Sequence, residues 1–172
     1  MGGELRGIAA LVQLLGAPAA RGGGEGGAAL VKALCGALRG LVAADDNKSR
    51  FTDAGGPAAV VDVMRMYPAV ASVQEVALGC LAAAILRNPE GAIAAVEAGA
   101  ASAAVDACDA HPKAAGVARQ LCLFARNAVC RTPETREAVL QAGVESKLRE
   151  AQTAFPGKCK DVAHAALRDL AL

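Results

Sequence analysis

Two groups of residues in this sequence have types and spacings that could do chemistry. Gly22, Gly24 and Gly27, in the stretch "RGGGEGGAAL", satisfy the pattern G-x-G-x-x-G and run directly into a helical pattern. A dinucleotide-binding turn is written in this way. Cys108 and His111 form a C-x2-H pair, and a C-x4-H pair follows near the end of the chain; both contain the side chains that zinc prefers. Either hypothesis depends on the elements that would hold these residues.

The composition favours a chain of closely packed helices. Apolar residues make up 54% of the 172 residues, but only 2% are aromatic. Alanine, the strongest helix former, is the most frequent residue and has too little bulk to fill a β-sandwich. The net charge of +1 provides no global attraction to nucleic acid or an acidic membrane surface. The longest apolar run, residues 76–86, is too short to span a bilayer.

The sequence repeats with a period of about 44 residues. An Ala-Gly pair, a proline and the motif [NT]-P-E each recur at this interval, and three independent markers with one period indicate a repeat protein. The markers are Ala54-Gly55, Ala98-Gly99 and Ala142-Gly143; Pro68, Pro112 and Pro156; and "RNPE" (87–90) with "RTPE" (131–134).

Each marker predicts a helix boundary. Asn88 and Thr132 are expected to cap a short first helix whose first position is proline. The glycine of Ala-Gly ends that helix, because it tolerates the left-handed C-terminal conformation. A second helix follows and stops near the next proline, over residues 57–67, 101–111 and 145–155. A longer third helix completes each unit, over residues 72–87, 115–131 and 158–170.

We therefore predict one domain over residues 1–172, with complete repeats at 47–88, 89–132 and 133–172. Residues 1–46 form a partial repeat that lacks its first helix, since "RGIAALVQLL" aligns with "GGPAAVVDVM" (55–64). The same N-terminal text loosely imitates a secretory signal with an A-x-A cleavage site, but a repeat helix explains it better. A solenoid end without a polar cap is costly, so we expect a fragment of a longer protein or a truncated gene product.

The three-helix unit of about 42–44 residues resembles the armadillo-repeat family. Its third helices carry an A-L-x-N-L-A pattern, to which "FARNAV" (124–129), "ALRDLA" (166–171) and "ALRGLV" (37–42) are similar, with "LAAAIL" (81–86) as a degenerate copy. The resemblance implies an all-α, right-handed α-solenoid in the cytoplasm or nucleus. It also implies that the third helices line a concave binding face.

In this register the glycine-rich stretch loses its phosphate-binding context. A helix precedes it instead of the β-strand that a dinucleotide fingerprint needs, and Ala28-Ala29 stand where a P-loop has Lys-Ser/Thr. We expect a flexible insertion between two helices, with the third helix beginning at "AAL" (28–30), and no cofactor.

The cysteine pairs likewise favour packing. Cys108 occupies the repeat position of Met64 and Gln152, and His111 occupies that of Tyr67 and Phe155. Positions filled by ordinary packing residues elsewhere indicate core or edge roles, so we expect no metal at these pairs or at Cys159 and His164. We interpret the cysteines as buried small hydrophobes in a reducing compartment. No nucleophile elbow or H-E-x-x-H motif is present, and we expect no enzyme activity.

The remaining signal is electrostatic. The predicted third helices carry few acids (Glu75, Asp161 and Asp169) beside many cations: Lys32, Arg39, Arg87, Arg119, Arg126, Arg131, Lys158, Lys160 and Arg168. The ordinary alternative is that charges occupy whichever helix faces are wet. In peptide-binding armadillo proteins an Asn of each third helix bonds the backbone of an extended ligand. Asn127 alone matches here, which argues against a receptor for nuclear-localisation signals.

These observations predict a protein–protein interaction scaffold whose basic inner face binds an acidic or extended partner segment, with no small-molecule substrate. Nucleic-acid binding by the same stripe is the alternative. It predicts a steep salt dependence and lacks aromatic residues for base stacking. The residues expected to contact the partner are Lys32, Arg39, Arg119, Arg126, Asn127 and Arg168.

Overall fold

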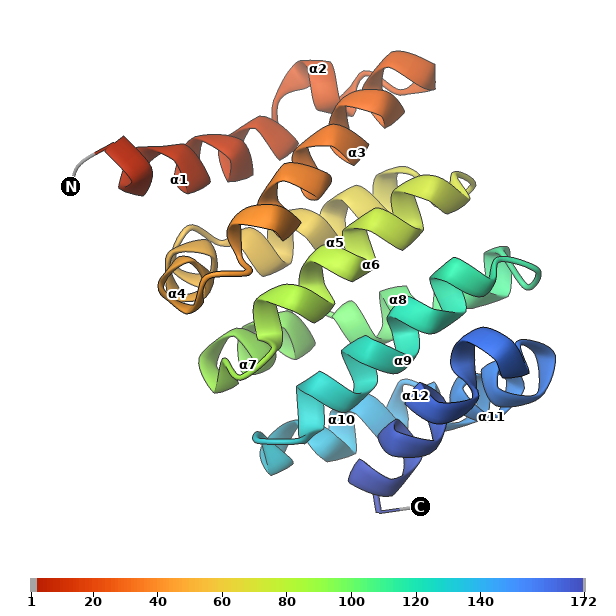
Figure 1. Cartoon of the computed structure of the whole chain (residues 1–172). Coiled ribbons are helices and arrows are strands. Elements are labelled where there is room, and N and C mark those ends of the chain that lie inside the picture. Colours follow the sequence, from red (N-terminus) through yellow and green to blue (C-terminus); the bar gives the residue numbers. More distant parts are fainter. Residues whose placement is uncertain (1–2, 172) are drawn as a thin grey trace.

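The computed structural model describes residues 3–171, and the side chains from Gly7 to Ala171. Every regular element in this range is a helix (Figure 1). In chain order the elements are α1 (Gly3–Leu15), α2 (Pro18–Arg21), α3 (Gly24–Leu41), α4 (Asp45–Asp53), α5 (Gly56–Met66), α6 (Ala71–Ile85), α7 (Pro89–Glu97), α8 (Ala100–Ala110), α9 (Ala115–Val129), the 3₁₀ turn η1 (Pro133–Thr135), α10 (Arg136–Gln141), α11 (Val144–Ala154) and α12 (Pro156–Asp169).

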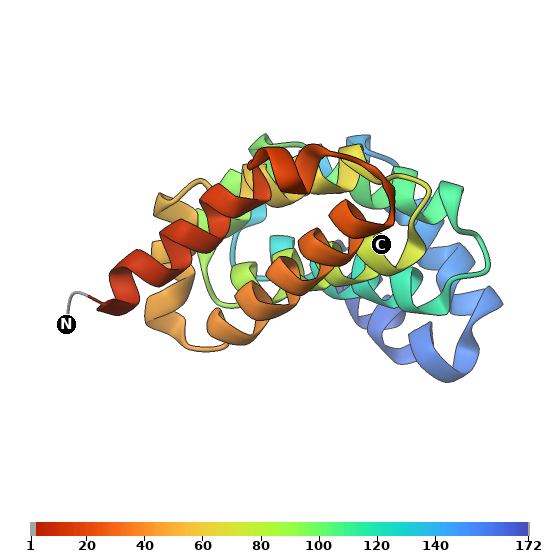
Figure 2. The ribbon, with the colours of Figure 1, turned by 90° about the horizontal axis from the view of Figure 1, so that it is seen from above.

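The helices form a helical-repeat arrangement of two layers. α3, α6, α9 and α12 lie side by side and contact one another in that order (Figure 1). α1, α5, α8 and α11 lie behind them as a second layer, which Figure 2 shows from above. The short helices α4, α7 and α10 connect one unit to the next. We call the exposed surface of α3, α6, α9 and α12 the third-helix face.

The glycine markers behave as the sequence predicts. Gly55, Gly99 and Gly143 have φ angles of 73°, 88° and 84°, in the left-handed region that side chains with a Cβ rarely adopt. Each separates a short first helix from the second helix of its unit. The predicted second and third helices agree with α5, α6, α8, α9, α11 and α12 to within a few residues at each end.

The two predicted N-caps differ. Asn88 Oδ1 accepts a hydrogen bond from Gly91 N at 3.3 Å, as expected of an N-cap. The prediction for Thr132 was wrong, because its side chain makes no capping bond. The chain instead forms η1, and Thr135 Oγ1 donates to the carbonyl oxygens of Ala128 or Thr132, each at 2.7 Å. A threonine three residues later therefore satisfies one carbonyl at this junction.

Most of the glycine-rich stretch is helix, and only Gly22 and Gly23 lie between helices, in place of the predicted flexible insertion. A short helix, α2, precedes it, and α3 begins at Gly24 instead of at "AAL". Gly27 is buried inside α3, and a Cβ placed on it would collide with Tyr67 Oη, which donates a hydrogen bond to Ala20 O. Glycine is favoured at position 27 because the Tyr67 hydroxyl of the next unit packs directly against the backbone there.

Polar side chains satisfy the carbonyls at helix ends. Lys48, only 3% exposed, donates to Leu86 O at 2.7 Å, which joins the first helix of its unit to the end of the third. Arg136 Nε does the same for Leu170 O at 2.8 Å. The last carbonyls of a helix have no partner within it, so each of these contacts supplies a missing hydrogen bond and ties the first helix of a unit to the end of its third helix. Among the described residues no single helix is long and apolar enough to cross a bilayer, although the bent pair α7–α8 passes that test when its two helices are taken together.

Candidate functional site

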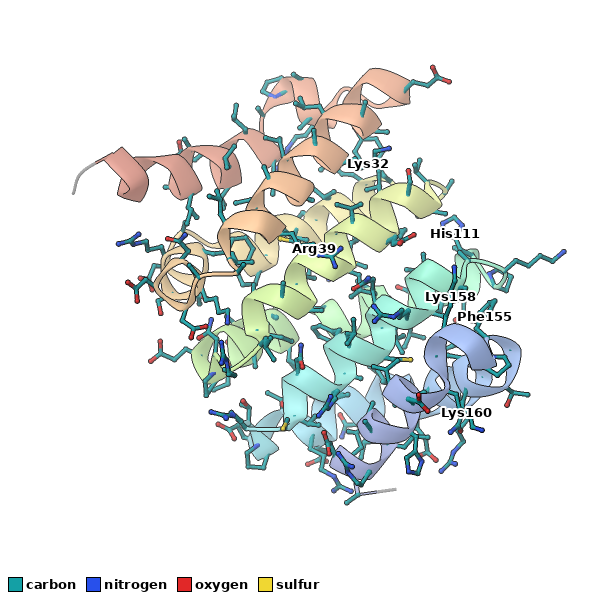
Figure 3. The ribbon with its side chains drawn as sticks, in the orientation of Figure 1. Lys32, Arg39, His111, Phe155, Lys158 and Lys160 are labelled. Carbon is teal, nitrogen blue, oxygen red and sulfur yellow. The ribbon has the colours of Figure 1, made fainter. Side chains whose placement is uncertain are left out.

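Arg39 crosses the third-helix face from α3 to α6. Its guanidinium lies over Gly79, where a Cβ would approach Arg39 Nη1 to 2.9 Å and Gln120 Oε1 of α9 to 3.2 Å. Figure 3 shows Arg39, like Lys32, projecting from α3 over the neighbouring α6. Because Gly79 has no side chain, the guanidinium can lie flat on the helix backbone. Arg39 is exposed.

Two further cations meet at the junction of α9 and α12. Burial raises the pKa of the Cys159 thiol, and the positive charges of Arg119 and Lys158 oppose that increase, which places both side chains near this buried sulfur. Arg119 and Lys158 are themselves exposed. Lys158 and Lys160 project from the first turns of α12 (Figure 3). Exposed cations of this face thus come from α3, α9 and α12, whereas α6 carries none within its bounds.

The face is not uniformly basic. Glu75 of α6 lies over Gly116 of α9, in the way that Arg39 lies over Gly79. It is exposed and has no cation within ion-pair distance among the residues described. A carboxylate therefore lies within the cationic stripe, which will repel an acidic ligand locally.

Arg126 and Arg168 are already paired within the chain. Arg126 Nε lies 3.1 Å from Asp169 Oδ2, and Arg168 Nη2 lies 3.0 Å from Asp169 Oδ1. Asp169 is only 15% exposed, so one partly buried carboxylate holds both guanidinium groups. They are weaker candidates for partner contact than Lys32, Arg39 and Arg119.

Asn127 has a structural task that the sequence did not indicate. Its Nδ2 donates to Ala82 O of α6 at 2.9 Å. The usual partner of that carbonyl would be Leu86 N, which instead bonds Ala83 O. Asn127 thus caps the C-terminal end of the preceding third helix. The expected bond from Asn127 to a ligand backbone conflicts with this use of its amide.

The cysteine and histidine pairs do not assemble into a metal centre. Among the side chains described, from Gly7 to Ala171, no three of His, Cys, Asp or Glu lie close enough to hold an ion. Cys159 is buried whereas His164 is exposed. His111 Nε2 lies 2.8 Å from Pro68 O, and because a carbonyl only accepts, this nitrogen carries the proton.

The cysteines in the part of the chain described are free thiols. Burial raises the pKa of Cys35, Cys108 and Cys122 to about 12 in each case. The thiolate is the reactive form, so burial makes these groups inert at neutral pH. Cys130 differs, because it is exposed after the end of α9.

A cavity that the sequence did not indicate lies between α8, α9 and α11. It has a volume of about 590 Å³, and its wall includes Cys108, His111, Ala118 and Phe155. A smaller cavity, of about 230 Å³, lies one unit earlier in the chain and includes Met64 and Gln74. Aligning the repeats could have pointed to the larger cavity, since Cys108 and Ala118 are shorter than the residues they replace.

Comparisons with known proteins match the fold only. No family model matches the sequence, and no curated protein matches it. Among solved structures, a crystal structure of an engineered protein from the Northeast Structural Genomics Consortium is similar, with a TM-score of 0.80 over 95% of this chain at 22% identity. This chain spans 63% of the length of that protein. The similarity establishes an all-α, helical-repeat-like fold.

Proposed function

We propose that this chain is an armadillo-type right-handed α-solenoid that acts as a non-catalytic protein-interaction scaffold in the cytoplasm or nucleus. Three features support assignment to the armadillo-repeat family: the repeat length, the three helices per unit and the sequence of the third helices. We also propose, from the stretches "NPEGAIAAVEAG" (88–99) and "CKDVAHAALRDL" (159–170), that the chain resembles the C-terminal repeats of armadillo-repeat-containing protein 6. The bound ligand is an acidic or extended segment of a partner protein, which lies along the third-helix face.

The observation that carries this proposal is the set of exposed cations without an internal partner. In the region described, no carboxylate oxygen lies within ion-pair distance of Lys32, Arg39, Arg119, Lys158 or Lys160. Cations of the second-helix layer, in contrast, include the paired Arg65, Lys147 and Arg149. Unpaired charges on one face attract a ligand of opposite charge and increase its association rate.

Nucleic acid is the competing ligand for the same cations. Sequence-tolerant binding of single strands relies on aromatic side chains that stack on bases. Phe51 and Phe124 are fully buried, and Tyr67 is 6% exposed. Phe155, half-buried, lines the large cavity between α8, α9 and α11. The face thus offers charge without stacking, which favours a protein ligand.

The test uses a fluorescein-labelled octaglutamate peptide and a labelled oligothymidylate of matched charge. The variant Arg39→Glu/Arg119→Glu removes two unpaired cations from the third-helix face, and Lys113→Glu, in the turn between α8 and α9, is the control. Near about 50 mM salt, where charges are weakly screened, we expect the double variant to bind the peptide at least about tenfold more weakly, with a flatter salt dependence. Lys113→Glu should retain at least half of the affinity.

Two outcomes oppose the proposal. Equal weakening by the control would show that net charge, and not the third-helix face, governs binding. Steeply salt-dependent capture of oligothymidylate without capture of the peptide would favour the nucleic-acid alternative.

A further inference from the structure

The two cavities beside α5 and α8 are the same site in consecutive units. Every residue that lines the cavity of about 230 Å³ has its equivalent, 44 positions later, in the wall of the cavity of about 590 Å³. Three of these pairs matter here: Met64 and Cys108, Pro68 and Pro112, and Gln74 and Ala118. Because the same helices of each unit enclose both cavities, the difference between their volumes follows from the side chains that line them.

In the smaller cavity Gln74 closes the end of α5. Its Nε2 donates to Met64 O and to Tyr67 O, each at 2.8 Å, and Gln74 is 2% exposed. Met64 O has no amide donor one turn later, because that residue is Pro68, which lacks an N–H. The carboxamide thus supplies the hydrogen bond that the proline cannot.

In the larger cavity this closure is missing. Cys108 O has the same proline, Pro112, one turn later, while Ala118 stands where Gln74 would be and is too short to reach a carbonyl. Within the described part of the chain no donor reaches Cys108 O. His111 O keeps only the bond from Ala114 N, at 2.9 Å. The cavity therefore combines a free carbonyl with the space left by a missing glutamine side chain.

The wall selects a neutral ligand. Two cations at the rim, Lys147 and Arg149, offset two carboxylates, Asp109 and Glu150. Lys147 Nζ lies 2.7 Å from Asp109 Oδ1 and 2.8 Å from Glu150 Oε2. Phe155 and the alanines of α11 supply an apolar surface. A volume of about 590 Å³ lies in the range of small-molecule pockets. An apolar body with one N–H donor head fits this wall.

We propose that the cavity between α8, α9 and α11 is a binding site for a small molecule that carries a primary carboxamide on an apolar body. The carboxamide takes the place that Gln74 occupies in the preceding unit and donates to Cys108 O and His111 O. The apolar body lies against Ala118 and Phe155. The site is independent of the third-helix face and of the partner proposed for it.

Benzamide is the probe, and acetophenone is its match in size without an N–H donor. In amide ¹H–¹⁵N spectra of the labelled chain, benzamide shifts residues around Cys108, Ala118 and Phe155. Acetophenone binds at least about fivefold more weakly, since it cannot satisfy the carbonyl. Equal shifts from both compounds, shifts confined to other parts of the chain, or no shift with benzamide would each overturn the proposal.

Two variants at one position complete the test. Ala118→Gln reproduces the preceding unit, so it should abolish the benzamide shifts and increase the midpoint of thermal unfolding. Ala118→Glu fills the same space with acceptors only and should lower that midpoint. If Ala118→Gln retains benzamide binding, the proposal is wrong. If either variant fails to fold, the contrast between benzamide and acetophenone in the native chain still decides it.

Discussion

The contact between Gly27 and Tyr67 gives a stability prediction that can be worked from the structure. A Cβ on Gly27 would lie 2.3 Å from Tyr67 Oη, 3.4 Å from Cζ of the same ring and 3.4 Å from Ala20 O. Gly27→Ala must therefore displace a buried hydroxyl that bonds Ala20 O. Overpacking of this kind costs about 1–3 kcal/mol, which outweighs the gain of about 1 kcal/mol from replacing a helical glycine by alanine.

A double-mutant cycle isolates the hydroxyl. Tyr67→Phe removes the colliding oxygen and leaves Ala20 O without its donor, at a cost of about 1–3 kcal/mol. In that background Gly27→Ala should be neutral or stabilising by up to about 1 kcal/mol, because the closest ring atom lies at 3.4 Å. The two changes should therefore be non-additive by about 1–3 kcal/mol.

Urea unfolding followed by helical circular dichroism measures all four chains. Gly26→Ala is the matched control, since a Cβ there meets nothing within 4 Å, and it should stabilise the chain by up to about 1 kcal/mol. Additivity of Gly27→Ala and Tyr67→Phe within about 0.5 kcal/mol would refute the reasoning. Equal changes in stability from Gly26→Ala and Gly27→Ala would also refute it, because a flexible loop would respond in the same way at both positions.

Three further predictions concern buried polar groups and thiols. Gln74→Met keeps the volume of the side chain but removes two hydrogen bonds and strands Met64 O, so urea unfolding should show a loss of about 2–3 kcal/mol; a loss below about 0.5 kcal/mol would contradict this capping role. An aromatic disulfide reagent at about pH 8 should label Cys130 first and the buried thiols only on unfolding, a sequence that mass spectrometry can follow. The raised pKa values of Cys35 and Cys122 keep these thiols protonated in the folded chain, so their contribution is complete below the unfolded thiol pKa and is lost as pH increases from about 9 toward 12. Stability that does not fall in this window would rule out the contribution, and Cys35→Ala should reduce the slope.

The repeat plan could be predicted from the sequence because its markers act locally. A proline lacks an N–H and a glycine accepts positive φ wherever they occur, so Gly55, Gly99 and Gly143 indicate helix ends without any knowledge of packing. The prediction of a flexible insertion at the glycine-rich stretch was wrong because the structure there depends on a contact far away in the sequence. Gly27 leaves room for the Tyr67 hydroxyl, 40 residues later in the chain, and a prediction from neighbouring residues alone treats such a glycine as flexible.

The candidate site could be predicted less well, because pairing depends on neighbours in space. The sequence placed the cations on the third helices, but it could not show that Asp169 holds Arg126 and Arg168 or that Asn127 bonds Ala82 O. The large cavity follows from two shorter side chains, Cys108 and Ala118, in place of Met64 and Gln74. The lack of a glutamine at position 118 can be interpreted only once the structure shows that Gln74, its equivalent in the preceding unit, bonds two carbonyls.

The most direct test of the proposed scaffold is to locate the bound acidic peptide. Backbone amide shifts of the ¹⁵N-labelled chain should be recorded during a titration with octaglutamate. The account predicts shifts on α3, α6, α9 and α12, centred on Arg39 and Arg119, which fade as salt is added. Shifts centred on the second-helix layer, or an affinity for this peptide that salt does not change, would contradict it.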